Sequence, residues 1–229
     1  MVDIATQLGA VDRGIRTTDV DGVPSYVQSL SQSYPSPIAD VWDALTSPDR
    51  IGRWFLPVSG DLRLGGHYQL EGNAGGEVLA CDPPSGDGAG SDRASFRLSW
   101  VFGGGEPTFV TVFLRAEGDD RTRFELEHVA AVDSVPPGVW EQFGPAGTGM
   151  GWDSGLLGLG LHLTAPEARP DDIEAWTMSD EGKAFLRGSA DAWAAAQIAD
   201  GTDPAAAKAA ADQTYGMYTG QVPGPDHAA

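Results

Sequence analysis

The chain contains three consecutive segments in which apolar and polar residues alternate: ASFRLSWVF (94–102), TFVTVFLRA (108–116) and TRFELEHVA (122–130). Alternation with a period of two is typical of β-strands that have one face buried. The connections are short and rich in glycine, at 103–107 and at 118–120. Because parallel strands need long crossover connections, strands joined this closely pair antiparallel. The segments therefore predict the centre of an antiparallel meander.

The same period extends toward the N-terminus. Further strands are predicted at GDLRL (60–64), HYQLEG (67–72) and GEVLAC (76–81). An earlier hairpin is predicted from RGIRTT (13–18) to the alternating run 26–34, because Asp21-Gly22 between them is a strong turn signal. Between the hairpin and the meander, Ser36-Pro37 and Ser47-Pro48 each predict the start of a short helix.

The C-terminal third has helical spacing. GMGWDSGLLGLGLHL (149–163) predicts a helix whose many glycines make it depend on tertiary packing. Two more helices are predicted over 179–201 and from Asp203 to about Tyr218. We expect this extension to pack on the domain as a clasp through Phe185, Leu186, Trp193 and Ile198, although a partner subunit could cover the glycine-rich helix instead.

Composition limits the function. The chain has 229 residues, 14 Lys+Arg and 33 Asp+Glu, which give a net charge of −19. Such a charge disfavours nucleic acid and anionic membranes as partners. A single cysteine, Cys81, excludes an internal disulfide. We expect a cytoplasmic protein, because no apolar run is long enough to span a membrane and no secretion signal is evident near Met1.

The chemistry-bearing motifs are weak. The glycine-rich pieces at 72–76, 103–107 and 144–151 lack the pattern of a phosphate-binding loop. The histidines show no metal-ligand spacing, and His128 is better interpreted as a hydrogen-bonded structural residue. Cys81 beside Asp82 is not an activated thiol, and Ser154 lies in a predicted helix where no nucleophile elbow belongs. We expect no metal, no cofactor and no catalytic residue.

Aromatic residues are spread over every predicted element. They either fill the core or line a cavity between the sheet and the helix over 149–163, and the sequence does not choose between these interpretations. Arg97, Glu77 and His67 could add polar groups to such a cavity, or lie on exposed strand faces. The residues predicted to line the cavity are Trp54, Phe55, Trp100, Phe102, Phe113, Trp152 and Leu156.

The order of elements resembles the helix-grip fold of the START-like (SRPBCC) superfamily. Six segments narrow the resemblance: SPIADVWDALTSPDRIGRWF (36–55), DLRLGGHYQL (61–70), GGEVLACDPP (75–84), LSWVF (98–102), TVFLRAEGDDRTRFELEH (111–128) and GMGWDSGLLGL (149–159). Together they are similar to the bacterial members of the family of activator of heat-shock-protein ATPase homologues, over about residues 26–163.

The resemblance implies an α+β fold with a six- to seven-stranded antiparallel curved sheet around a long helix. It divides the chain into an N-terminal helix and hairpin strand (1–25), the helix-grip domain (26–163) and a helical extension (165–229) packed on that domain. Its members include co-chaperone domains, and the superfamily includes lipid carriers and cyclases. We expect a small hydrophobic molecule as ligand; the alternatives are a cyclase- or hydrolase-type enzyme using the same cavity, and a chaperone-binding module. A homodimer remains an open alternative.

Overall fold

The structure, a computed structural model, describes residues 3–84 and 92–224. Eight strands form one open antiparallel sheet in the order β1-β2-β8-β7-β6-β5-β4-β3. The strands are β1 (Asp12–Val20), β2 (Val23–Tyr34), β3 (Val58–Gly60), β4 (His67–Leu70), β5 (Gly75–Asp82), β6 (Arg93–Trp100), β7 (Thr108–Ala116) and β8 (Thr122–Ala131). The stretch DPPSGDGAGSD (82–92), which its composition predicts to be a loop, falls mostly outside the described residues.

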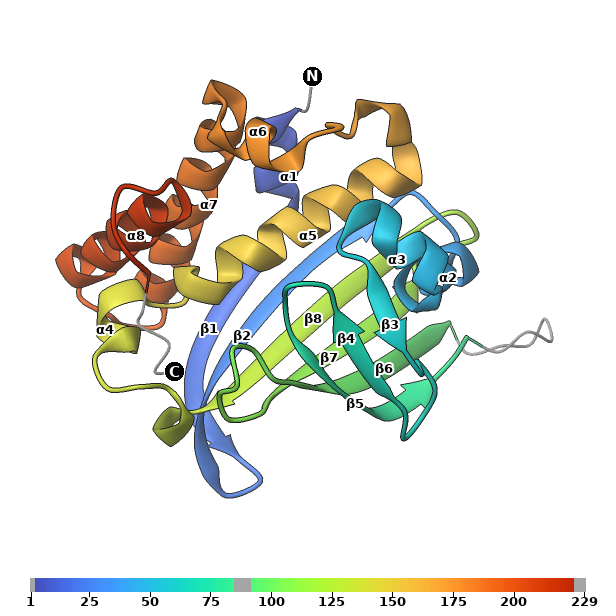
Figure 1. Cartoon of the computed structure of the whole chain (residues 1–229), viewed down its shortest axis with the longest axis horizontal. Coiled ribbons are helices and arrows are strands. Elements are labelled where there is room, and N and C mark those ends of the chain that lie inside the picture. Colours follow the sequence, from blue (N-terminus) through green and yellow to red (C-terminus); the bar gives the residue numbers. More distant parts are fainter. Residues whose placement is uncertain (1–2, 85–91, 225–229) are drawn as a thin grey trace.

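The helices gather on the concave side of the sheet (Figure 1). They are α1 (Ile4–Ala10), α2 (Ile38–Thr46), α3 (Pro48–Trp54), α4 (Val139–Phe143), α5 (Ala146–Thr164), α6 (Ile173–Met178), α7 (Asp180–Ala199) and α8 (Pro204–Tyr218), with short 3-10 turns η1 (Val132–Ser134) and η2 (Pro166–Ala168). Helix α5 crosses the curved sheet, α2 and α3 lie toward one end of it, and α7 and α8 lie beyond it on the side of β1.

Local chemistry explains most of these elements. Asp21 and Gly22 both have positive φ, 51° and 83°, as the tight turn of the β1–β2 hairpin requires. The carboxylate of Asp203 accepts hydrogen bonds from the amides of Ala205 and Ala206 and so caps α8. The Ser179 hydroxyl caps α7 in the same way through the amide of Gly182.

The glycines of α5 allow close approach to its neighbours. A Cβ at Gly149 would lie 2.2 Å from the Trp193 ring, and a Cβ at Gly158 would lie 2.4 Å from the Trp54 carbonyl oxygen. Packing against α7 and α3 therefore requires glycine at these two positions, and it offsets the low helix propensity that glycine brings.

The six- to seven-stranded sheet expected of the helix-grip domain is extended to eight strands by β1, which pairs with β2 along its whole length as the predicted hairpin requires. Two sequence predictions need correction. The segment predicted as a strand at 60–64 is mostly a turn: the strand ends at Gly60, and the backbones of Gly65 and Gly66 bond to Val78 instead. Residues 139–143 and 173–178, for which no helix was predicted, form α4 and α6.

The extension contributes to the main hydrophobic core. Phe185, Leu186 and Trp193 of α7 are at most 2% exposed and belong to the same cluster as Leu156 and Leu159 of α5. Ile198 is partly buried against that cluster. The division of the chain at residues 26 and 163 stays a prediction.

Candidate functional site

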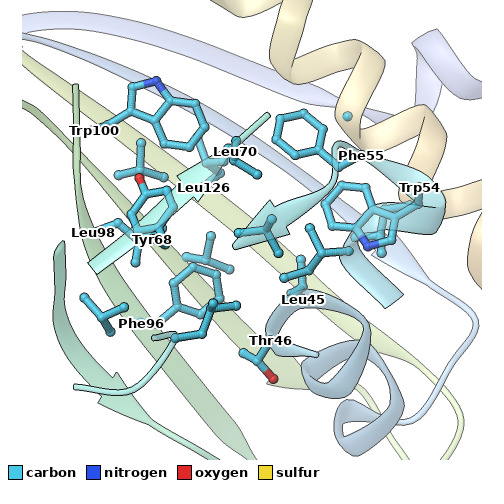
Figure 2. A pocket seen from close by; sticks show the side chains of 18 of the residues that line it. Leu45, Thr46, Trp54, Phe55, Tyr68, Leu70, Phe96, Leu98, Trp100 and Leu126 are labelled. Atoms are coloured by element: carbon cyan, nitrogen blue, oxygen red, sulfur yellow. The ribbon is translucent and has the colours of Figure 1, made fainter. Parts of the chain in front are cut away.

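An apolar cavity of about 130 Å³ lies between the concave face of the sheet and helices α2, α3 and α5 (Figure 2). The sheet supplies its floor and sides with Tyr68, Leu70, Val78, Cys81, Phe96, Leu98, Trp100, Val110, Val112, Phe124 and Leu126. The helices and the segment after α3 supply the remaining wall with Leu45, Thr46, Ile51, Trp54, Phe55, Val58, Leu62, Trp152, Gly155, Leu156 and Leu159. Several of these side chains are only half-buried, so the cavity reaches the surface.

Aromatic rings stand at two sides of the cavity. Trp54 and Phe55 stack with their ring centroids 5.4 Å apart at the end of α3. Trp100 of β6 lies 4.9 Å from Trp152 of α5 and 6.4 Å from Tyr68 of β4. Figure 2 shows Trp100 and the Trp54–Phe55 pair on opposite sides of the space. The cavity therefore has two aromatic walls with aliphatic side chains between them.

Three polar groups of the lining already have hydrogen-bond partners within the protein. The indole N–H of Trp54 donates to the carbonyl of Ala44 at 2.9 Å, and the Tyr68 hydroxyl donates to the carbonyl of Ser99 at 2.9 Å. The Thr46 hydroxyl donates to its own helix, at the carbonyl of Trp42.

The cavity lining contains no Asp, Glu, Lys, Arg or His. Its thiol is that of Cys81, whose pKa is raised by burial and by the neighbouring Asp82. A raised pKa keeps the thiol protonated and poorly nucleophilic at neutral pH. The lining therefore offers a ligand apolar contact rather than charge or acid–base chemistry.

His128 fixes one aromatic wall from behind. The indole N–H of Trp152 donates to Nδ1 of His128 at 3.1 Å, so Nδ1 carries no proton in the neutral ring. The proton is then on Nε2, which donates to the Thr108 hydroxyl at 2.8 Å, and that hydroxyl donates to the carbonyl of Trp100 at 3.0 Å. Burial lowers the pKa of His128 to about 4, which keeps the ring neutral.

Five of the seven predicted cavity residues line the cavity: Trp54, Phe55, Trp100, Trp152 and Leu156. Phe102 and Phe113 do not, which corrects the prediction for both. Phe113 is 42% exposed because its neighbours Val112 and Leu114 face inward on β7. Phe102 is 48% exposed because β6 ends at Trp100 and the chain turns away after it.

Sequence reasoning missed the aliphatic part of the lining. Val110, Val112 and Leu126 occupy inward-facing positions of alternating strands, and this alternation is the signal that could have placed them in the lining. Arg97, Glu77 and His67 do not line the cavity; the guanidinium of Arg97 lies over the ring of Phe109, 4.9 Å from its centroid.

A second polar cluster lies on the opposite side of α5. Arg13 of β1 contacts both carboxylate oxygens of Asp153, with Nη2 2.8 Å from Oδ1, and the two side chains are 6% and 1% exposed. Ser189 and Trp193 of α7 also donate to Oδ2 of Asp153. Burial raises the pKa of Asp153, while these hydrogen bonds act in the opposite direction. We call these four residues the Asp153 clamp; they connect β1, α5 and α7.

A metal-binding cluster and a membrane-spanning helix are both absent from residues 3–84 and 92–224. No group of three or more His, Cys, Asp or Glu side chains in these ranges could hold a metal ion. No helix in the same ranges has the length and apolar character needed to cross a membrane.

An open antiparallel sheet curved around one long helix, with an apolar cavity between them, defines the helix-grip fold of the START-like (SRPBCC) class. Within that class, residues 35–159 match the family described as Activator of Hsp90 ATPase homolog 1-like protein. The chain belongs to this family.

Solved structures agree. The crystal structure of CalU16 from Micromonospora echinospora is 32% identical, with a TM-score of 0.63 over 82% of this chain and 98% of that chain. Its solution NMR structure is 30% identical, with the same TM-score over 83% and 97%. A protein of unknown function from Enterococcus faecalis, 13% identical with a TM-score of 0.53 over 87% and 96%, shares the fold. No curated protein matches this chain.

Proposed function

We propose that the protein binds a small hydrophobic molecule in the cavity between α5 and the sheet, without transforming it. The observation that carries the proposal is a cavity whose lining is almost wholly apolar in the interior of a domain that otherwise packs closely. Protein interiors leave few voids larger than a water molecule, and ligand sites are mostly apolar concavities.

Five residues carry the proposed contacts: Trp54, Phe55, Trp100, Trp152 and Leu156. They come from α3, the segment after it, β6 and α5, so a ligand would touch each structural layer around the cavity. The Trp152 and Trp100 positions are held by the hydrogen-bonded chain through His128.

Two other functions have less support. A cyclase or hydrolase using this cavity needs an acid–base pair beside the substrate, and the lining has no ionisable carboxylate, amine or imidazole. A chaperone-binding role rests on the name of the family alone.

Fluorescence of the uncharged naphthalene dye prodan tests the proposal. We expect the wild-type protein to shift and enhance the emission, and Gly155→Leu to abolish the effect by filling the cavity. A Cβ at Gly155 would make ordinary contacts with Phe55 at 3.6 Å, so the helix tolerates a side chain there.

Phe113→Ala is the matched control, because this aromatic side chain is exposed outside the cavity. It should bind the dye as the wild type does. Unchanged binding by Gly155→Leu would place the dye elsewhere, and absence of binding to the wild type would contradict the proposal.

A further inference from the structure

If the cavity binds a ligand, as proposed above, its volume limits the size of the enclosed part of that ligand. An engineered protein cavity of about 150 Å³ accommodates benzene. The space of about 130 Å³ between α5 and the sheet therefore holds one aromatic ring or a fragment of that size. Any larger part of a ligand must extend through the side where the lining is half-buried.

The hydrogen-bonding state of the lining restricts the chemistry of that fragment. The N–H groups of Trp54 and Trp152 and the hydroxyl groups of Tyr68 and Thr46 all donate to partners within the protein. A polar group on the enclosed fragment would lose its water without gaining one of these donors. Such a group is costly to bury beside these four residues, so the part of the fragment that they enclose is apolar.

Charge adds a second restriction. The lining has no basic side chain to pair with an anion and no carboxylate to pair with a cation, so a buried charge of either sign would lose its water without gaining an ionic partner. A net charge of −19 also repels anions before they reach the surface. A fatty acid or another carboxylate would need a cationic partner that the lining does not supply.

The two aromatic walls distinguish planar rings from aliphatic chains. Aromatic pairs prefer edge-to-face or offset arrangements and gain energy beyond the area that they bury. The pair Trp100–Trp152 is already tilted by 55° at 4.9 Å, and the chain through His128 holds both. A ring entering between them and Phe55 meets ring edges and faces that do not need to be reoriented.

From these observations we propose that the cavity selects an uncharged aromatic ring over an aliphatic group of equal size and over charged aromatic molecules. Polar substituents of the ligand lie on its half-buried side. The aromatic walls confer this selectivity, and Trp100 is the specificity-determining residue among them.

Protection of Cys81 tests the proposal, because Cys81 is the sole cysteine and lines the cavity. The rate of its reaction with methyl methanethiosulfonate is followed by mass spectrometry in the full chain. The probes are toluene, methylcyclohexane, benzoate and phenyltrimethylammonium, and calorimetric titration supplies an independent affinity for each.

We expect toluene to bind at least tenfold more tightly than methylcyclohexane, a difference of about 1.4 kcal/mol, and both charged probes to bind more weakly still. Trp100→Leu should reduce the preference for toluene severalfold, and Phe113→Leu should leave it unchanged. Phe55→Leu provides a second wall variant should Trp100→Leu not fold.

Equal or tighter binding of methylcyclohexane or of a charged probe would overturn the inferred selectivity and leave the proposed function standing. If neither method detects binding of any of the four probes, the proposed function fails together with the inference.

Discussion

The two sides of helix α5 differ in how completely they are packed. On the side of α7, Asp153 is 1% exposed, accepts hydrogen bonds from three side chains and lies beside a fully buried Trp193. On the side of α3 and β6, the same helix borders a cavity with Trp152, Gly155 and Leu156. One side of α5 therefore supplies stability, which allows the other side to remain open for a ligand.

Removal of the extension should have the largest effect. Truncation after Pro166 deletes Phe185, Leu186 and Trp193, each contributing about 1.5–3 kcal/mol through burial. It also leaves Asp153 with only Arg13. We expect a loss of roughly 5 kcal/mol or more of unfolding free energy, measured by urea denaturation. An equally stable, monomeric truncated protein would show that the clasp is dispensable.

Breaking the Asp153 clamp is the next largest change. Arg13→Ala leaves a buried carboxylate without its cation and should lower the unfolding free energy by about 3–5 kcal/mol. Arg16→Ala, on the same strand, removes an exposed contact to Glu127 and should cost less than about 1 kcal/mol. Similar denaturation midpoints for the two variants would contradict a buried clamp.

On the cavity side, His128 should make the unfolding free energy depend on pH. Native His128 has a pKa of about 4, against about 6.5 when unfolded, so between these values the unfolded chain binds the extra proton. Stability should therefore fall as pH decreases from about 6.5 to about 4, by up to about 3 kcal/mol in total.

His128→Gln removes this pH dependence. Because the variant keeps all carboxylates of the wild type, their titration cancels when the two proteins are compared. The difference in unfolding free energy between wild type and variant should therefore shrink as pH falls through that window. A constant difference from pH 7 to pH 4 would mean that His128 is not held neutral in the folded protein.

The smallest effects are expected for alanine substitutions at two glycines of α5, Gly155 and Gly158. Gly155→Ala adds a methyl group at ordinary contact distance from Phe55 and should stabilise by up to about 1 kcal/mol, mainly through helix propensity. Gly158→Ala places a methyl group 2.4 Å from the Trp54 carbonyl oxygen and should destabilise by about 1–3 kcal/mol. Both variants are followed by thermal unfolding, and shifts of the same sign would contradict this difference between two glycines on the α3 side of α5.

The local sequence pattern predicted those parts of the fold whose conformation is determined by neighbouring residues in the chain. Alternation placed β6, β7 and β8, and Asp21-Gly22 placed the first hairpin. The prediction for 60–64 was wrong in most of its length because the backbones of Gly65 and Gly66 bond to Val78, a partner that no local period reveals.

The site was only partly predictable for the same reason. Alternation along β7 turns Phe113 outward between Val112 and Leu114, whereas its aromatic character alone suggested a cavity residue. Asp153 and Arg13 are 140 residues apart in the chain, so their ion pair follows from tertiary structure alone.

Trp152 and Asp153 are consecutive, and consecutive side chains project about 100° apart around a helix. Any rotation of α5 that widened the cavity would pull Asp153 away from Arg13 and Ser189. We therefore expect α5 to stay in place and α3, with the chain from Phe55 to Gly66, to move when a ligand enters. We expect the amide hydrogens of residues 54–66 to exchange with solvent faster than those of α5. The rate at which this segment opens would then set the rate of ligand uptake and release. Slow exchange at 54–66 would refute this route.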